Sequence, residues 1–121
     1  MVTEYKNTPG VLLFLLGNEN NYGLFWDGAE TEDIPMEDRK STIRAEAMYK
    51  IFNKAIVEMK TIDQSHPMAI CNGDLLFLNI IAKECKDIDI LGVTMYRGAT
   101  FTDAFERAKK EFDKPLLFTE F

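Results

Sequence analysis

The feature that most constrains this chain is the alternation of short apolar runs with segments of helical pattern. Four runs are almost continuously apolar and are bounded by turn residues: Val11–Leu16, Met68–Cys71, Ile88–Met95 and Leu116–Phe118. None alternates apolar and polar residues, as a strand with one solvated face would. Such runs are typical of parallel strands that are covered on both faces or that form the wall of a barrel. We therefore predict four parallel strands.

The segments between the runs predict helices. Apolar residues recur at helical spacing in residues 43–62, 75–84 and 101–112. We expect Ser41 or Thr42 to be the N-cap of the first helix and Asp74 that of the second. Thr100 and Asp103 stand in capping-box spacing at the start of the third. The stretch at residues 2–7 resembles the tail of a further helix.

The fold class follows from this order of elements. Strands alternating with helices imply a parallel sheet with right-handed crossovers, and the class is therefore α/β. Two architectures share the order, an open doubly wound sheet and a TIM (β/α)₈ barrel, and periodicity does not separate them. A whole barrel needs about 250 residues. The 121 residues of this chain could supply about half of one, and both ends look cut.

Composition excludes several classes of partner. The formal net charge is −6 and the basic residues are scattered, which argues against nucleic acid. No apolar stretch approaches the length of a membrane span. The polar segment after Met1 shows no secretory leader, so a cytoplasmic location is slightly favoured and the localisation is otherwise open. Cys71 and Cys85 lie in apolar surroundings, lack metal spacing, and are expected to be free core thiols.

Polar residues follow every apolar run, at the strand ends where parallel α/β folds place their functional groups. Two of these ends carry a glutamate, Glu19 and Glu120. Two carboxylates that converge over one face suit cleavage of a glycosidic bond. One protonates the leaving oxygen and the other attacks the anomeric carbon, and a retaining enzyme holds them about 5–5.5 Å apart.

Five further side chains are candidates for binding or orienting a polyhydroxylated ligand: Asn18, Asn20, Trp26, Asn72 and Tyr96. Each has a plainer interpretation. The asparagines after the first run could be turn formers, and Trp26 could belong to the core. Tyr96 could be a wall residue whose hydroxyl is satisfied locally. Even the glutamates could be charges at helix N-termini.

A family resemblance bears on these alternatives. The segment from Tyr5 to Glu19, with its core VLLFLLGNE, resembles the fourth-strand signature of the clan of retaining glycoside hydrolases whose catalytic domain is a (β/α)₈ barrel. It looks most like family 2, which contains β-galactosidases, β-glucuronidases and β-mannosidases. By this resemblance Glu19 matches the general acid/base, and Asn18 matches the asparagine that hydrogen-bonds the sugar 2-hydroxyl.

The rest of the chain continues the resemblance in the family's order. Residues 63–67 (DQSHP) look like the lead into the fifth strand, and residues 89–98 (DILGVTMYRG) resemble the sixth. There Tyr96 matches the tyrosine that orients the nucleophile. Residues 114–121 (KPLLFTEF) resemble the seventh strand, on which Glu120 matches the nucleophile. The resemblance covers essentially the whole chain and implies a partial TIM barrel, strands four to seven with their helices.

The function implied is retaining hydrolysis of O-glycosidic bonds by double displacement, with a carbohydrate substrate and no metal or organic cofactor. We expect the chain to be inactive alone, and to need the remainder of the barrel or to self-associate through exposed strand edges. The alternatives are a non-catalytic doubly wound ligand-binding module and an engineered or split half barrel. The sequence leaves open the sugar, its anomer and the choice between hydrolysis and transglycosylation.

Overall fold

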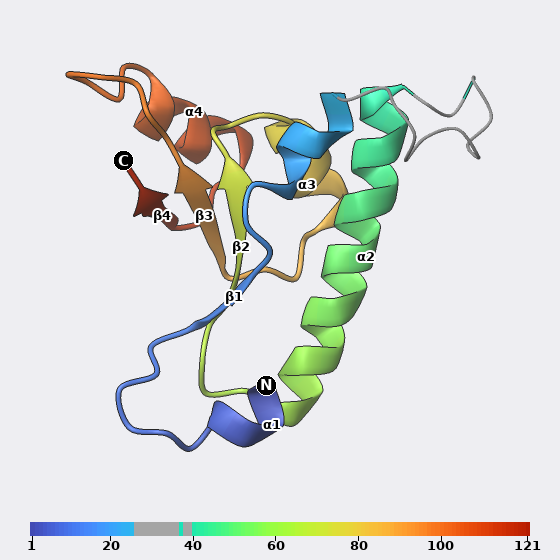
Figure 1. Ribbon diagram of the computed structural model, residues 1–121, viewed down its shortest axis with the longest axis vertical. Helices are drawn as coiled ribbons and strands as arrows, with labels where there is room; N and C mark the ends of the chain where they lie inside the picture. Colours follow the sequence, from blue (N-terminus) through green and yellow to red (C-terminus); the bar gives the residue numbers. More distant parts are fainter. Residues whose placement is uncertain (26–36, 38–39) are drawn as a thin grey trace.

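The computed structural model describes residues 1–25, 37 and 40–121 and shows an α/β fold around one parallel sheet (Figure 1). The sheet has four strands in the spatial order β1-β2-β3-β4, and all three neighbouring pairs are parallel. The strands are β1 (Phe14–Leu16), β2 (Met68–Gly73), β3 (Ile90–Thr94) and β4 (Leu116–Glu120). The predicted α/β class with parallel strands is confirmed.

Helices connect the strands. They are α1 (Val2–Tyr5), the 3₁₀ helix η1 (Asn20–Phe25), α2 (Ser41–Ile62), α3 (Leu78–Glu84) and α4 (Ala104–Glu111). The long helix α2 matches its predicted extent. Its N-cap is Lys40, so the prediction of a Ser41 or Thr42 cap is wrong, and Lys40 provides no side-chain cap.

The caps predicted for the other two helices are also wrong. The Asp74 carboxylate accepts the Leu75 N–H at 2.6 Å, but the chain then makes a turn, and α3 begins only after Phe77, which is left-handed with φ 59°. The capping box before α4 does not form, and the Asp103 carboxylate binds Arg97 at 3.0 Å instead. Arg97 also binds the Asp74 carboxylate, so one arginine takes both groups that were expected to cap these helices.

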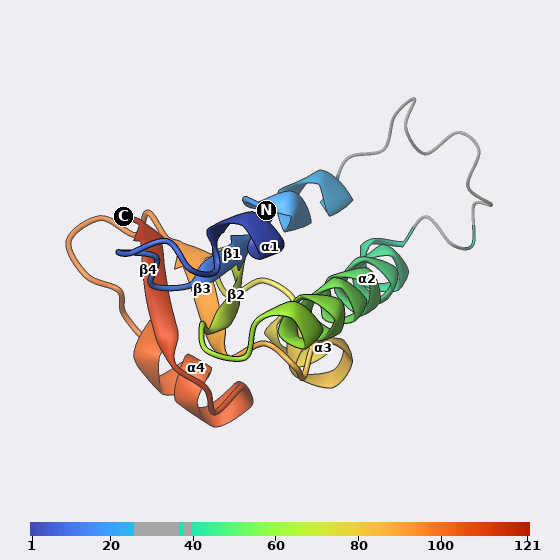
Figure 2. The ribbon, with the colours of Figure 1, turned by 90° about the horizontal axis from the view of Figure 1, so that it is seen from below.

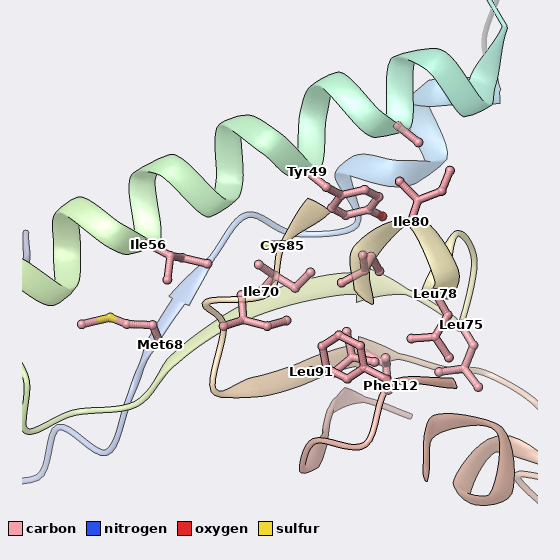
Figure 3. Packing of buried hydrophobic residues seen from close by; sticks show 14 of the residues in the cluster. Tyr49, Ile56, Met68, Ile70, Leu75, Leu78, Ile80, Cys85, Leu91 and Phe112 are labelled. Carbon is pink, nitrogen blue, oxygen red and sulfur yellow. The ribbon is translucent and has the colours of Figure 1, made fainter. Parts of the chain in front are cut away.

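One face of the sheet carries α2, α3 and α4 (Figure 2). Ile70 of β2 pairs with Leu91 of β3, and both point into a core that Tyr49 and Ile56 of α2 and Phe112 complete (Figure 3). On β4, Phe118 packs against Phe101 with ring centroids 4.3 Å apart. Each fully buried side chain of this size contributes about 1.5–3 kcal/mol, so this layer holds the strands in place.

The opposite face of the sheet is not covered by these three helices (Figure 2). Leu15, Cys71, Gly92 and Thr119 alternate with the residues of the helix-covered face. A Cβ on Gly92 would lie 2.5 Å from the Ile70 carbonyl oxygen and 3.2 Å from the Leu15 and Thr119 side chains. Only glycine fits at that position, because the neighbouring strands approach so closely.

The amino-terminal ends of the strands hold paired charges. Asp63 accepts hydrogen bonds from Ser65 Oγ at 2.7 Å and pairs with His66 Nδ1 at 2.6 Å. The bonds from Ser65, followed by those from His66, hold the pKa of Asp63 well below its usual range. Lys60 and Asp89 form an ion pair at 2.6 Å, and the same carboxylate caps the first N–H of β2. Both carboxylates at this end of the sheet are therefore held by hydrogen bonds from nearby groups.

Both cysteines are buried and free, as predicted. Burial raises the pKa of the Cys85 thiol to about 12. Within the part of the chain that the structure describes, no helix is long and apolar enough to cross a membrane.

Candidate functional site

The candidate site lies at the carboxyl-terminal edge of the sheet and begins with a sharp turn after β1. Gly17 has φ 75° and Glu19 has φ 50°, both in the left-handed region. A Cβ on Gly17 would clash with Asn20 Oδ1, which accepts the Asn18 N–H at 2.9 Å. The Glu19 N–H donates to the Cys71 carbonyl at 3.0 Å. This turn ties Glu19 to the end of β2.

The side chain of Glu19 then reaches the third strand. The hydroxyl of Thr94, at the end of β3, donates a hydrogen bond to Glu19 Oε1. Thr94 is only 1% exposed, and its backbone pairs with Gly73 of β2. The bond therefore fixes a carboxylate from β1 over the end of β3.

A β-bulge sets the second carboxylate. Val93 pairs with Phe118, but the next residue of β3, Thr94, pairs with Glu120, so Thr119 is an extra residue on β4. Bulges redirect side chains and occur often beside active sites. Thr119 Oγ1 lies 3.3 Å from Cys71 Sγ on the uncovered face. The side chain of Glu120 follows it at the edge of the sheet.

The Tyr96 hydroxyl holds that carboxylate, donating to Glu120 Oε2 at 2.7 Å. This hydrogen bond, slight desolvation and the charges of Glu120 and Glu19 raise the pKa of Tyr96. The pKa of Tyr22 is raised by burial and then by the charges of Glu19 and Asp74. Both glutamates thus act on Tyr96, and the structure places Glu19, Tyr96 and Glu120 at the same edge of the sheet.

The other sequence candidates separate into three groups. Asn18 lies in the same place, and its Oδ1 is 3.4 Å from Cys71 Sγ. Asn20 is used in the turn after β1. Trp26 lies outside the described residues.

The structure places Asn72 away from the two glutamates, on the helix-covered face. Its Oδ1 accepts the Tyr49 hydroxyl at 2.5 Å, and its Nδ2 donates to the carbonyls of Asp74 at 2.8 Å and Leu76 at 3.1 Å. It is 2% exposed. These bonds use the amide to fold the loop after β2, and we leave Asn72 out of the candidate site.

Sequence reasoning missed three residues that shape the site: Asn21, Cys71 and Thr94. The buried Asn21 amide forms a two-way bridge with Gly73, donating to its carbonyl at 2.9 Å and accepting its N–H at 2.7 Å. Cys71 lies between Asn18 and Thr119. The only available signal was the even spacing of Thr94 and Tyr96, which places both on one face of a strand.

An ion cluster supports the loop after β3. Arg97 binds Asp74 through Nη2 and Oδ1 at 2.5 Å and Asp103 through Nη1 and Oδ1 at 3.0 Å. Partial burial opposes ionisation of Asp74, but the hydrogen bonds from Arg97 and the Leu75 N–H and the charge of Arg97 together outweigh it and lower the pKa of Asp74. The guanidinium thus anchors the backbone next to Tyr96.

A cavity of about 330 Å³ lies beside Tyr96. It is lined by Met95, Tyr96, Arg97, Gly98, Phe101 and Phe121. Aromatic walls with a few polar groups are typical of sites for small organic ligands. Within residues 1–25, 37 and 40–121, no three His, Cys, Asp or Glu side chains are placed to hold a metal ion.

Comparisons with protein-family models, with curated proteins and with solved structures find no match for this chain. Its function is therefore inferred from the geometry of the strand ends and from the sequence pattern.

Proposed function

We propose that this chain is the part of a (β/α)₈ barrel that carries both catalytic carboxylates of a retaining glycoside hydrolase. The observation that carries the proposal is the convergence of Glu19 and Glu120. They come from the two edge strands, β1 and β4, and both contact residues at the end of β3. Paired carboxylates on one strand edge match the requirements of glycosidic bond cleavage.

In the proposed reaction, Glu120 is the nucleophile and Tyr96 orients it. Glu120 attacks the anomeric carbon, the bond to the aglycone oxygen breaks, and Glu19 gives its proton to that oxygen. Glu19 then takes a proton from water, the resulting hydroxide attacks the anomeric carbon, and the bond to Glu120 breaks. Two displacements leave the anomeric configuration unchanged. Asn18 is placed to hydrogen-bond the sugar beside Glu19.

The strand order supports a barrel over a doubly wound sheet. A doubly wound sheet reverses its strand order and carries helices on both faces. The four strands here run in chain order, and α2, α3 and α4 lie on one face (Figure 2). A (β/α)₈ barrel repeats this arrangement eight times, with its helices outside and its active site at the carboxyl ends of the strands.

The proposed partner is the remainder of that barrel. Apolar side chains of the β1 region are open to solvent, with Leu12 80% exposed. On the helix side of β4, a hollow of about 230 Å³ is lined in part by Phe105, Ala108 and Leu116, where the helix after a seventh barrel strand would pack. We therefore propose that the chain alone is inactive and self-associates through its strand edges.

Expression of the chain together with its flanking coding sequence, or with a complementing half barrel, tests the activity. A panel of aryl glycosides identifies the sugar, and NMR of the first-formed product gives its anomer. A 2-deoxy-2-fluoro glycoside of that sugar should label Glu120, as peptide mapping by mass spectrometry would show. The variant Glu120→Gln should lose the label, whereas Glu106→Gln on the exposed face of α4 should keep it.

Three outcomes would count against the proposal. Inversion of configuration or a label on another residue would refute the assigned roles. Sugar binding without turnover in the completed barrel would favour the binding module. Light scattering after size-exclusion chromatography tests the chain alone, and a single monomeric species that hydrolyses aryl glycosides would refute the barrel-fragment proposal.

A further inference from the structure

We propose that Thr94 is a positioning residue that fixes the Glu19 carboxylate relative to Glu120, an inference that rests on the proposed function. Among the residues that the structure describes, the Thr94 hydroxyl is the side-chain donor to the Glu19 carboxylate. Through its backbone, Thr94 is also the residue of β3 that pairs with Glu120. The hydrogen bond to the Glu120 carbonyl comes from the next residue, Met95, at 3.0 Å. Thr94 therefore binds the Glu19 side chain and lies directly opposite Glu120 in the sheet.

Glu19 needs such a support because its own backbone does not fix its side chain. It sits in a turn with φ 50°, beyond the last residue of β1 and partly exposed. A glutamate side chain has several rotatable bonds, and ordering it costs conformational entropy. A donor on a rigid strand reduces the range of positions that the carboxylate occupies.

Thr94 is well suited to be that donor. It is buried to 1% exposure, its carbonyl accepts the Asp74 N–H at 2.8 Å, and its side chain is β-branched, which restricts χ1. Catalytic groups held by residues that are themselves locked are placed more accurately than groups on free loops. The hydroxyl has little freedom to follow Glu19 if the carboxylate moves.

The separation of the two carboxylates decides the chemistry. About 5–5.5 Å allows direct attack and retention, whereas about 6.5–9.5 Å leaves room for a water and gives inversion. The β4 bulge sets Glu120 against the backbone of Thr94, and the Thr94 hydroxyl sets Glu19. Loss of the hydroxyl alone should release one carboxylate and leave the other in place.

The first experiment uses the 121-residue chain and needs no substrate. The pKa of Tyr96, which the charges of Glu120 and Glu19 raise, is measured from the ultraviolet absorbance of tyrosinate, and Tyr96→Phe identifies its signal. Glu19→Gln should lower this pKa, and its value gives the reference for a protein without the Glu19 carboxylate. Thr94→Val should lower it in the same direction, and Thr94→Ser should restore the wild-type value.

A Tyr96 pKa in Thr94→Val that equals or exceeds the wild-type value would overturn the inference. Far-ultraviolet circular dichroism confirms that each variant is folded. If the Val variant does not fold, Thr94→Ala, which also lacks the hydroxyl but is smaller, answers the same question.

The second experiment uses the completed barrel and depends on leaving groups. A mispositioned Glu19 delivers its proton poorly, so Thr94→Val should lower kcat/KM about 10–100-fold for alkyl glycosides, within the range of general acid catalysis. For dinitrophenyl glycosides, whose leaving group needs no proton, the fall in kcat/KM should be much smaller. Equal losses on both substrates would indicate a merely structural role. A wild-type barrel without turnover would defeat the proposed function and leave the Tyr96 result standing.

Discussion

The two ends of the parallel sheet use similar residues in opposite ways. At the amino-terminal end, the Asp63 and Asp89 carboxylates are each bound by a nearby cation or hydroxyl and by a backbone N–H. At the carboxyl-terminal end, Glu19 and Glu120 each accept one hydroxyl and have no cation beside them among the described residues. The first end holds its carboxylates in hydrogen bonds and an ion pair, which stabilises the fold, whereas the second end leaves two carboxyl groups open to a ligand.

The two ends of the sheet also differ in backbone conformation, since left-handed φ angles occur after the first two strands. Glu19, three residues after β1, and Asp74, directly after β2, adopt left-handed conformations, whereas Asp63 before β2 is extended with φ −143°. A left-handed non-glycine residue costs roughly 1–2 kcal/mol, less for aspartate. Asp113 before β4 is left-handed too, with φ 54°, so the contrast is one of degree. Strain next to a candidate nucleophile or acid is consistent with a functional edge.

The largest expected effect is a loss of turnover caused by a change at the carboxyl-terminal end of the sheet. This change should leave the stability of the fold almost unaltered. Glu120→Gln in the completed barrel should lower kcat by more than about 10⁴-fold, the scale of losing a covalent nucleophile. The urea midpoint should change little, because the side chain is exposed. Turnover of Glu120→Gln within tenfold of wild type would show that the carboxyl-terminal end of the sheet is not the catalytic end.

The next effect tests Asn72, which lies at the functional end but points to the helices. Asn72→Ala should lower the free energy of unfolding by about 3 kcal/mol, since it leaves the buried Tyr49 hydroxyl and two partly buried carbonyls without their partner. The matched control Asn18→Ala, on an exposed asparagine, should change it by less than about 0.5 kcal/mol. A stable Asn72→Ala with weakened sugar binding would return Asn72 to the site.

A smaller effect measures the strain at Glu19 directly. Glu19→Gly and Glu19→Gln remove the same charge, but only glycine adopts φ 50° without cost. The Gly variant should therefore be more stable than the Gln variant by about 1 kcal/mol in urea unfolding. Equal stabilities would mean that the turn after β1 is unstrained.

The smallest effect at neutral pH belongs to the amino-terminal end and appears on acidification. The native pKa of Asp63 is held below the value of about 3.9 for an unfolded aspartate. Its contribution is therefore present above about pH 4 and is lost as the pH falls towards the native pKa. Between roughly pH 6 and pH 2, the melting temperature of the wild type should fall further than that of Asp63→Asn.

A second variant tests the cause of that effect. Ser65→Ala removes the hydrogen bond that most lowers the pKa of Asp63 and should give an intermediate loss. If the melting temperatures of wild type, Asp63→Asn and Ser65→Ala change with pH in parallel, the hydrogen bonds to Asp63 do not stabilise the fold in this way.

Local patterns predicted the elements of this molecule but not its irregularities. Helix α2 was predictable because its apolar residues repeat over 22 residues. The start of α3 was not, because Arg97, 23 positions away, binds the Asp74 carboxylate. Apolar runs carry no information about register, so the β4 bulge was invisible. Glu19, Tyr96 and Glu120 were predictable as a group because parallel strands end at one edge, whereas Thr94 was hidden inside an apolar run.

The extra residue on β4 has a genetic consequence. Side chains alternate along a strand, so deleting the single codon for Thr119 would restore regular pairing and place the following carboxylate directly after Phe118, in the position that Thr119 now occupies beside Cys71 on the uncovered face. The resulting protein would keep every other amino acid and every catalytic residue type. Chemistry at this edge would then depend on how many residues precede Glu120 in the strand, a property that substitution scanning alone does not reveal.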